Sequence, residues 1–133
     1  MEREIALSRK AFILGIPTAI SFGIVSVGER YGAMYELVES ETISRHIARD
    51  PGQIMVYAKM MAELARTIHA VTVSEGDGFS YATERLKPYI EGGIGRVDEA
   101  LAERCMTLVI GISTSSTLLH GDFHTGNVFL QKG

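Results

Sequence analysis

The chain has 133 residues, of which 46% are hydrophobic and 22% charged, so it has the size and composition of one folded domain rather than of a disordered or fibrous protein. Thirteen Lys and Arg against sixteen Asp and Glu give a net charge of −3, and no basic run is present. This pattern argues against a nucleic-acid partner, which requires a basic surface. The single cysteine, Cys105, cannot form an internal disulfide, and we expect a reducing, cytoplasmic location.

Two stretches without charged residues, 11–28 and 105–119, raise the question of a membrane segment. The first reaches the minimum length of a bilayer-spanning helix, but it contains Pro17 together with several glycines and hydroxyl side chains. The second stretch is too short to cross a bilayer as a helix. We therefore expect both stretches to be buried core and expect no membrane partner.

The first part of the chain predicts a helix followed by a β-hairpin. Apolar residues at helical spacing predict a helix over residues 3–14, which Gly15 and the following proline end. From Ile20 onward, large apolar residues alternate with small or polar ones, as in a strand. Residues 28–30 then form a turn and residues 31–38 a second strand, so the two strands pair antiparallel.

The middle of the chain predicts helices. Residues 42–49 predict a short helix, after which Asp50 suits an N-cap and Pro51 the first turn of a second helix. The second helix has a core stripe of side chains three or four positions apart: Ile54, Tyr57, Met61, Leu64, Ile68 and Val71. Gly76 and Gly78 end it.

The last part predicts two more helices and two short strands. Residues 80–90 predict a weak helix, with Pro88 and then Gly92, Gly93 and Gly95 marking a loop. Residues 97–112 predict a helix with a buried stripe of Val97, Leu101, Cys105, Leu108 and Ile112. Residues 117–119 and 128–130 are short apolar runs that predict two strands.

Between these strands lies the polar loop, residues 120–127, with the sequence His-Gly-Asp-Phe-His-Thr-Gly-Asn. Its spacing His-x-Asp-x-x-x-x-Asn is that of the kinase catalytic loop. Phosphoryl transfer needs a carboxylate to accept the hydroxyl proton, which suits Asp122, and an amide oxygen to bind Mg²⁺, which suits Asn127. His120 is expected to brace the loop by hydrogen bonds, and Gly121 to allow its tight course.

With these motifs the chain resembles the aminoglycoside phosphotransferase and choline kinase-like family of small-molecule kinases. The stretch LLHGDFHTGNVFL is close to that family's signature, and Gly121 stands where protein kinases usually carry Arg. AELARTIHAV resembles the helix upstream of the catalytic loop, and YGAMYELVE resembles the last N-lobe strand running into the hinge. GIPTA resembles the segment between the regulatory helix and the next strand.

The resemblance implies an α+β, protein-kinase-like fold. Residues 1–38 would be a remnant of the N-lobe, a helix plus a β-hairpin, and residues 39–133 a mostly helical C-lobe ending in the catalytic loop. The implied activity is ATP- and Mg²⁺-dependent phosphoryl transfer to a small-molecule hydroxyl. The implied site adds Glu36 and Val38, whose backbone carbonyl and amide would face adenine, and one glutamate of the first helix, Glu4 or Glu2, which in the family pairs with the phosphate-binding Lys.

The resemblance also implies that the chain is the middle part of such a kinase. The Gly-rich strands and phosphate-binding Lys that precede the first helix in the family have no counterpart here, nor does the metal-binding Asp that follows the catalytic loop. The alternative is therefore a catalytically inactive kinase-like fragment or a partner-binding domain. Its hairpin would keep an unpaired edge, through which the chain would form a homo-oligomer or bind a partner.

A metal-dependent hydrolase is a third interpretation of the polar loop. His120, Asp122 and His124 alternate, so on an extended chain all three would face one side as metal ligands. The other two histidines, His46 and His69, lie on separate predicted helices and supply no second cluster. Asp, Gly and Asn are also common in ordinary turns. We take the phosphotransferase as the working prediction.

Overall fold

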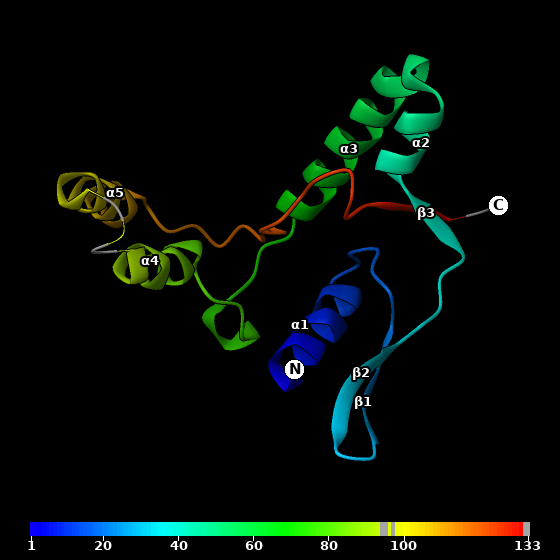
Figure 1. Ribbon diagram of the computed structural model, residues 1–133, viewed down its shortest axis with the longest axis horizontal. Coiled ribbons are helices and arrows are strands. Elements are labelled where there is room, and N and C mark those ends of the chain that lie inside the picture. Colours follow the sequence, from blue (N-terminus) through cyan, green and yellow to red (C-terminus); the bar gives the residue numbers. More distant parts are fainter. Residues whose placement is uncertain (94–95, 97, 132–133) are drawn as a thin grey trace. The chain divides into compact units, whose positions relative to one another are not determined.

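The computed structural model of the chain describes residues 1–93, 96 and 98–131 (Figure 1). Within them the structure is α+β, with five α-helices and two small antiparallel sheets of two strands each. The residues group into two compact units, the first made of residues 1–72 and the segment from 117 onward, the second of the residues between. The predicted lobe boundary after residue 38 falls inside the first unit and stays a prediction.

The first unit begins with the predicted helix and hairpin: α1 (Glu2–Ile13), β1 (Ser21–Val27) and β2 (Arg30–Tyr35). Val27 pairs with Arg30 across a two-residue turn, in which Gly28 has a φ of 61° that glycine adopts without strain. The second strand was expected to reach residue 38. It ends at Tyr35 because its partner on β1, Ser21, is the first residue of that strand.

The first unit continues with a second sheet and two helices: β3 (Ser40–Thr42), α2 (Ile43–Arg49), α3 (Ile54–His69) and β4 (Phe129–Gln131). Thr42 caps α2 by accepting from the Arg45 amide at 3.3 Å. Asp50 caps a single 3₁₀ turn, Pro51–Gln53, that leads into α3, so the predicted start signals are confirmed.

The two strands predicted beside the polar loop differ in outcome. The run at 128–130 becomes β4, which pairs antiparallel with β3. The run at 117–119 forms only an isolated bridge between Thr117 and Thr72. Its two backbone bonds join Leu118 to Val71 and Val73 to Ser116, and no ladder forms toward Leu119 because the opposite chain is helical up to His69.

The second unit contains a short 3₁₀ turn (Glu75–Asp77) and two helices that pack on each other, α4 (Ala82–Gly93) and α5 (Glu99–Gly111). The helix predicted over residues 80–90 is confirmed as α4, which contains Pro88. The loop predicted at Gly92 and Gly93 is wrong, since these two residues end the helix. Proline and glycine weaken a helix, but packing against a neighbouring helix can outweigh that cost. Gly95, predicted to mark the loop, and Val97, predicted to begin the buried stripe of the helix over residues 97–112, lie outside the described residues.

The buried face of α5 also differs from the predicted stripe. Ala102 and Val109 are buried, whereas Leu101, Leu108 and Ile112 are 50%, 71% and 52% exposed. Apolar residues lie on all sides of this helix, so its sequence does not single out one face. The packing partner α4 decides which face is covered.

The best-buried apolar side chains of the first unit include Ile43 on α2, Ile68 on α3 and Leu118 just before the polar loop. The predicted stripe of α3 is confirmed from Tyr57 to Ile68, since Tyr57, Met61 and Leu64 are half-buried and Ile68 is 3% exposed. Its first member, Ile54, is 52% exposed. The helix ends at His69, before Val71 and before the predicted end at Gly76.

The two uncharged stretches are only partly buried, which corrects the expectation of continuous core. In the first, Ile16 is buried, but Ile13 and Phe22 are 80% and 57% exposed. One helix beside a two-stranded sheet leaves most of its apolar side chains uncovered. Among the described residues, no helix is both long and apolar enough to cross a membrane.

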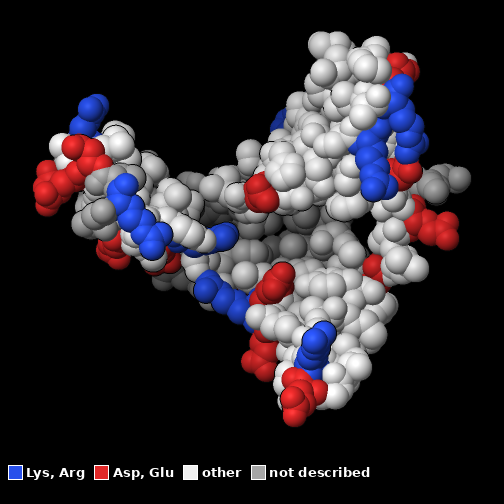
Figure 2. Space-filling view, viewed as in Figure 1, with Lys and Arg blue, Asp and Glu red and all other residues white. Residues whose placement is uncertain are grey.

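On the face drawn in Figure 2, basic and acidic side chains both occur over the hairpin, α2 and the helices of the second unit.

Candidate functional site

The polar loop is held at both of its ends by the first unit. On the side before the loop, the Leu118 amide donates to the carbonyl of Val71, just past α3, at 2.9 Å. On the side after it, the Ile43 amide donates to the carbonyl of Val128 at 2.9 Å, and β4 then pairs with β3. Both ends are therefore attached to segments that precede the loop by many residues.

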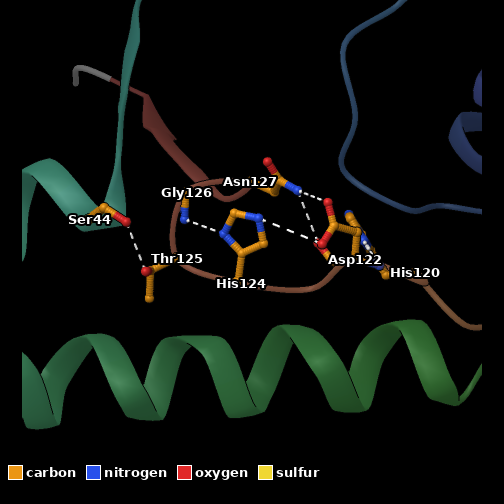
Figure 3. Close-up of polar contacts among 7 residues, drawn as sticks. All are labelled: Ser44, His120, Asp122, His124, Thr125, Gly126 and Asn127. Carbon is orange, nitrogen blue, oxygen red and sulfur yellow. Dashed lines mark hydrogen bonds and ion pairs between the residues drawn. The ribbon is translucent and has the colours of Figure 1, made fainter. Parts of the chain in front are cut away.

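A third attachment lies inside the polar loop, at Thr125. The Ser44 amide, at the start of α2, donates to the Thr125 carbonyl at 3.0 Å, and the two hydroxyl oxygens lie 2.8 Å apart (Figure 3). The first turn of a helix has amide groups without intrahelical partners, and Thr125 satisfies one of them. The loop is thus fixed to α2 at its middle.

Asp122 and Asn127, the two residues predicted to carry the chemistry, contact each other directly. The Asn127 Nδ2 donates to the Asp122 backbone carbonyl at 3.0 Å and to its Oδ2 at 2.8 Å. Gly121, with a φ of 82°, allows the chain to turn just before Asp122. Because both bonds come from Nδ2, the Asn127 Oδ1 points away from Asp122 (Figure 3) and is the amide atom suited to a hard cation such as Mg²⁺.

The two histidines of the polar loop accept hydrogen bonds from its backbone. His120 Nδ1 accepts from the Asp122 amide at 3.3 Å, and its ring meets Phe123 edge to face with centroids 5.5 Å apart. This is the bracing arrangement expected of His120. His124 Nδ1 accepts from the Gly126 amide at 3.0 Å, and its Nε2 lies 3.7 Å from Asp122 Oδ1.

The polar loop does not have the extended geometry that the metal-hydrolase interpretation requires. Residues 121–127 run through bends and a turn, and the Nδ1 atoms of His120 and His124 already accept backbone amides. Within the described part of the chain, no group of three or more His, Cys, Asp or Glu side chains is placed to hold a metal ion. The Asp122 side chain is 76% exposed, so a substrate group can reach it from solvent.

The predicted adenine-binding residues lie away from the polar loop in sequence, in the connector between β2 and β3. The Glu36 amide donates to the Ile20 carbonyl at 2.8 Å, and the Glu36 Oε2 accepts from the Ile20 amide at 3.3 Å. The Val38 carbonyl accepts from the Ser40 hydroxyl at 3.2 Å. These bonds fix the connector locally and do not link it to Asp122. Adenine contacts through Glu36 and Val38 stay predictions.

The two candidates for the helix glutamate, Glu4 and Glu2, both lie in the first turn of α1 and are exposed. They differ in their surroundings, because Glu2 lines a hollow between α1 and β1 and Glu4 does not. The hollow, of about 310 Å³, is lined by Glu2, Ile5, Ala6, Arg9, Gly23 and Ile24. Neither glutamate contacts the polar loop.

Sequence reasoning missed the residues that hold the polar loop in shape. Ser44 and Thr125 were not singled out, because a contact between residues so far apart in the chain leaves no local pattern. His124 was considered only as a metal ligand. Its spacing of two from Gly126, which matches that of His120 from Asp122, is a signal that could have indicated a backbone-bound ring.

Comparison with known proteins does not place the chain in a family. No protein-family model matches it, and neither curated proteins nor solved structures give a significant match. The function is therefore inferred from the geometry and sequence of the polar loop.

Proposed function

We propose that the chain carries the catalytic loop of a kinase-like phosphotransferase that moves the γ-phosphoryl group of ATP to a small-molecule hydroxyl. The observation that carries this proposal is the direct contact between Asp122 and Asn127. It joins a carboxylate open to solvent with an amide whose oxygen is turned outward, at the spacing typical of kinase catalytic loops.

Each of the two residues has a defined part in the proposed reaction. The acceptor hydroxyl oxygen forms a bond to the γ-phosphorus while the bond from that phosphorus to the β-phosphate oxygen breaks, giving ADP. The hydroxyl proton passes to the Asp122 carboxylate, which acts as general base. Asn127 donates to Oδ2 of that carboxylate and so holds one of its two oxygens.

The residues present fit a hard divalent cation only in part. The Asn127 Oδ1 is an oxygen ligand of the kind that Mg²⁺ prefers, and Mg²⁺ commonly takes one or two protein ligands while phosphates and water complete its shell. Bound there, the cation would neutralise charge on the phosphates. The described residues provide this one amide oxygen beside Asp122, so we expect Mg²⁺ to bind together with the nucleotide and not alone.

Calorimetric titration with Mg·ATP tests the nucleotide site. We expect the folded protein to bind, and the Asn127→Ala variant to bind at least about tenfold more weakly, because it loses the cation ligand. Gln53→Ala, which removes an exposed amide just before α3, is the matched control and should bind like wild type. A folded wild-type protein without affinity for Mg·ATP, or equal binding by the Asn127 variant, would refute the proposal.

A second candidate function is binding of a partner, or of a second copy, along the hairpin. Within the described residues, β1 and β2 pair only with each other, so each strand has an open edge. Their exposed apolar side chains include Phe22, Val27 and Tyr31, which are 57%, 76% and 71% exposed. Such edges accept another strand. Light scattering tests self-association, and a strict monomer at all concentrations counts against it.

A further inference from the structure

We propose that His124 is a positioning residue that orients the Asp122 carboxylate. The inference rests on the proposed function, because it assigns a role to His124 only through the general base Asp122. It starts from the two nitrogen atoms of the imidazole ring, which face different partners in the polar loop (Figure 3).

The hydrogen bond to the backbone selects one tautomer of the neutral ring. Nδ1 accepts from the Gly126 amide at 3.0 Å, so it carries no proton. The ring proton is therefore on Nε2, the atom that lies 3.7 Å from Asp122 Oδ1. A donor thus faces the carboxylate, whereas the other tautomer would place a lone pair against it.

His124 and Asn127 hold the two oxygens of Asp122 from different sides. Asn127 donates to Oδ2 at 2.8 Å, and the His124 Nε2 faces Oδ1. The separation of 3.7 Å is an electrostatic contact and not yet a hydrogen bond. Contacts of this kind often tighten when substrate binds. Without His124, the carboxylate would be held through one oxygen alone.

The position of the ring is fixed by Gly126 as well as by the hydrogen bond. A Cβ atom at residue 126 would lie 2.8 Å from the His124 Cε1 and 3.0 Å from its Nδ1, which is too close for either to stay in place. Glycine at 126 therefore makes room for the ring. Because Thr125, between the two residues, is bonded to Ser44, the backbone beneath the ring is also attached to α2.

Two substitutions of His124 separate its contact with the backbone from its contact with Asp122. In His124→Asn, the shorter side chain can still accept from the Gly126 amide but does not reach Asp122. In His124→Gln, the longer amide can donate toward Asp122 and loses the short-range bond to the backbone. The two variants therefore keep one contact each.

The first test of the proposal is the rate of phosphoryl transfer by the His124→Asn and His124→Gln variants. If His124 positions Asp122, kcat falls at least about tenfold in His124→Asn and recovers in part in His124→Gln, with the KM for Mg·ATP unchanged in both. A ring that only supports the loop gives the opposite order, with the Asn variant the more active. That order, or equal activity in all three proteins, would overturn the proposal.

Nitrogen NMR of the His124 ring gives a result that needs no activity. We expect the Nε2–H tautomer in the wild-type chain, and a change of the Nε2 signal in Asp122→Asn and in Gly126→Ala. A wild-type protein that neither binds Mg·ATP nor transfers phosphate refutes the proposed function, and the NMR spectrum still decides the contact. An Nε2–H ring that responds to Asp122→Asn supports it, and an Nδ1–H ring overturns it.

Discussion

The polar loop and the β1–β2 hairpin keep their shapes in different ways. The loop depends on contacts between distant parts of the chain, such as Ser44 with Thr125 and Ile43 with Val128. The hairpin depends on pairing across its own two-residue turn, with one further bond from Arg9 on α1 to the Ser21 carbonyl. The loop is therefore sensitive to the core of the first unit, and the hairpin is sensitive mainly to its own residues.

This difference indicates in which region the structure supports a functional prediction with side chains that are already in place. In the polar loop, the side chains of Asp122 and Asn127 are already placed against each other. Next to the hairpin, the predicted adenine contacts would use backbone groups of Glu36 and Val38, two residues whose hydrogen bonds run to Ile20 and Ser40. Changes in the loop should therefore alter chemistry, and matched changes in the hairpin should not.

The largest effect is expected from Asp122→Asn. If Asp122 is the general base, its amide variant loses about 10²- to 10⁴-fold in phosphoryl transfer. The side chain is 76% exposed, so the melting temperature should stay close to that of wild type. The assay is ADP release with a panel of hydroxyl acceptors. Glu29→Gln in the hairpin turn is the control, with full activity expected, and an Asp122 variant that also kept full activity would contradict the assignment.

The next largest effect is expected on stability, from Ile43→Ala. Ile43 is 1% exposed and its amide bonds the segment after the polar loop, so removing its side chain leaves a cavity beside the loop's support. We expect a loss of about 3 kcal/mol in the free energy of unfolding, measured with urea. Leu37→Ala, at a side chain 92% exposed in the connector after β2, should change it by less than about 0.5 kcal/mol. Similar losses of unfolding free energy in Ile43→Ala and Leu37→Ala would contradict the view that the polar loop depends on the core of the first unit.

Sequence patterns predicted the parts of this structure that depend on neighbouring residues. The cap at Asp50 and the turn at Gly28 each follow from one or two residues and their local geometry. The tight course of the polar loop was predicted from its residues too, whereas the direct contact between Asp122 and Asn127 is seen only in the structure.

The parts that were not predicted depend on distant residues. Strand β3 is three residues long, without alternation, and exists because β4 lies beside it. The covered face of α5 is selected by α4, since apolar residues surround the helix. The bond of Thr125 to Ser44 likewise requires α2 to be in place. None of these features has a local sequence pattern.

A smaller effect is expected from the Ser44–Thr125 pair. A double-mutant cycle with Ser44→Ala and Thr125→Val should give a coupling of about 0.5 to 1 kcal/mol, because the hydroxyl bond is exposed and the backbone bond between the same residues remains. Urea unfolding of the four proteins measures it. Ser26→Ala, an exposed hydroxyl on β1, combined with Thr125→Val should show no coupling. Coupling of equal size in both cycles would mean that the bond does not hold the loop.

The smallest effect on folding is expected from Phe22→Lys on β1. Phe22 is 57% exposed, so the free energy of unfolding of the variant should lie within about 0.5 kcal/mol of the wild-type value. Its effect should instead be on association, since a lysine on an open strand opposes pairing with another strand. Light scattering over a range of concentrations would show the variant dissociating before wild type.

Met55→Lys is the matched control for that measurement. Met55 is 76% exposed on α3, so its substitution adds the same charge as Phe22→Lys but on a helix and not on the hairpin. Association that responds to Phe22→Lys and not to Met55→Lys assigns it to the strand edge. Equal responses would assign it to net charge. If the Phe22 variant is a monomer with unchanged phosphoryl transfer, the hairpin edge and the polar loop act independently, as their separate supports imply.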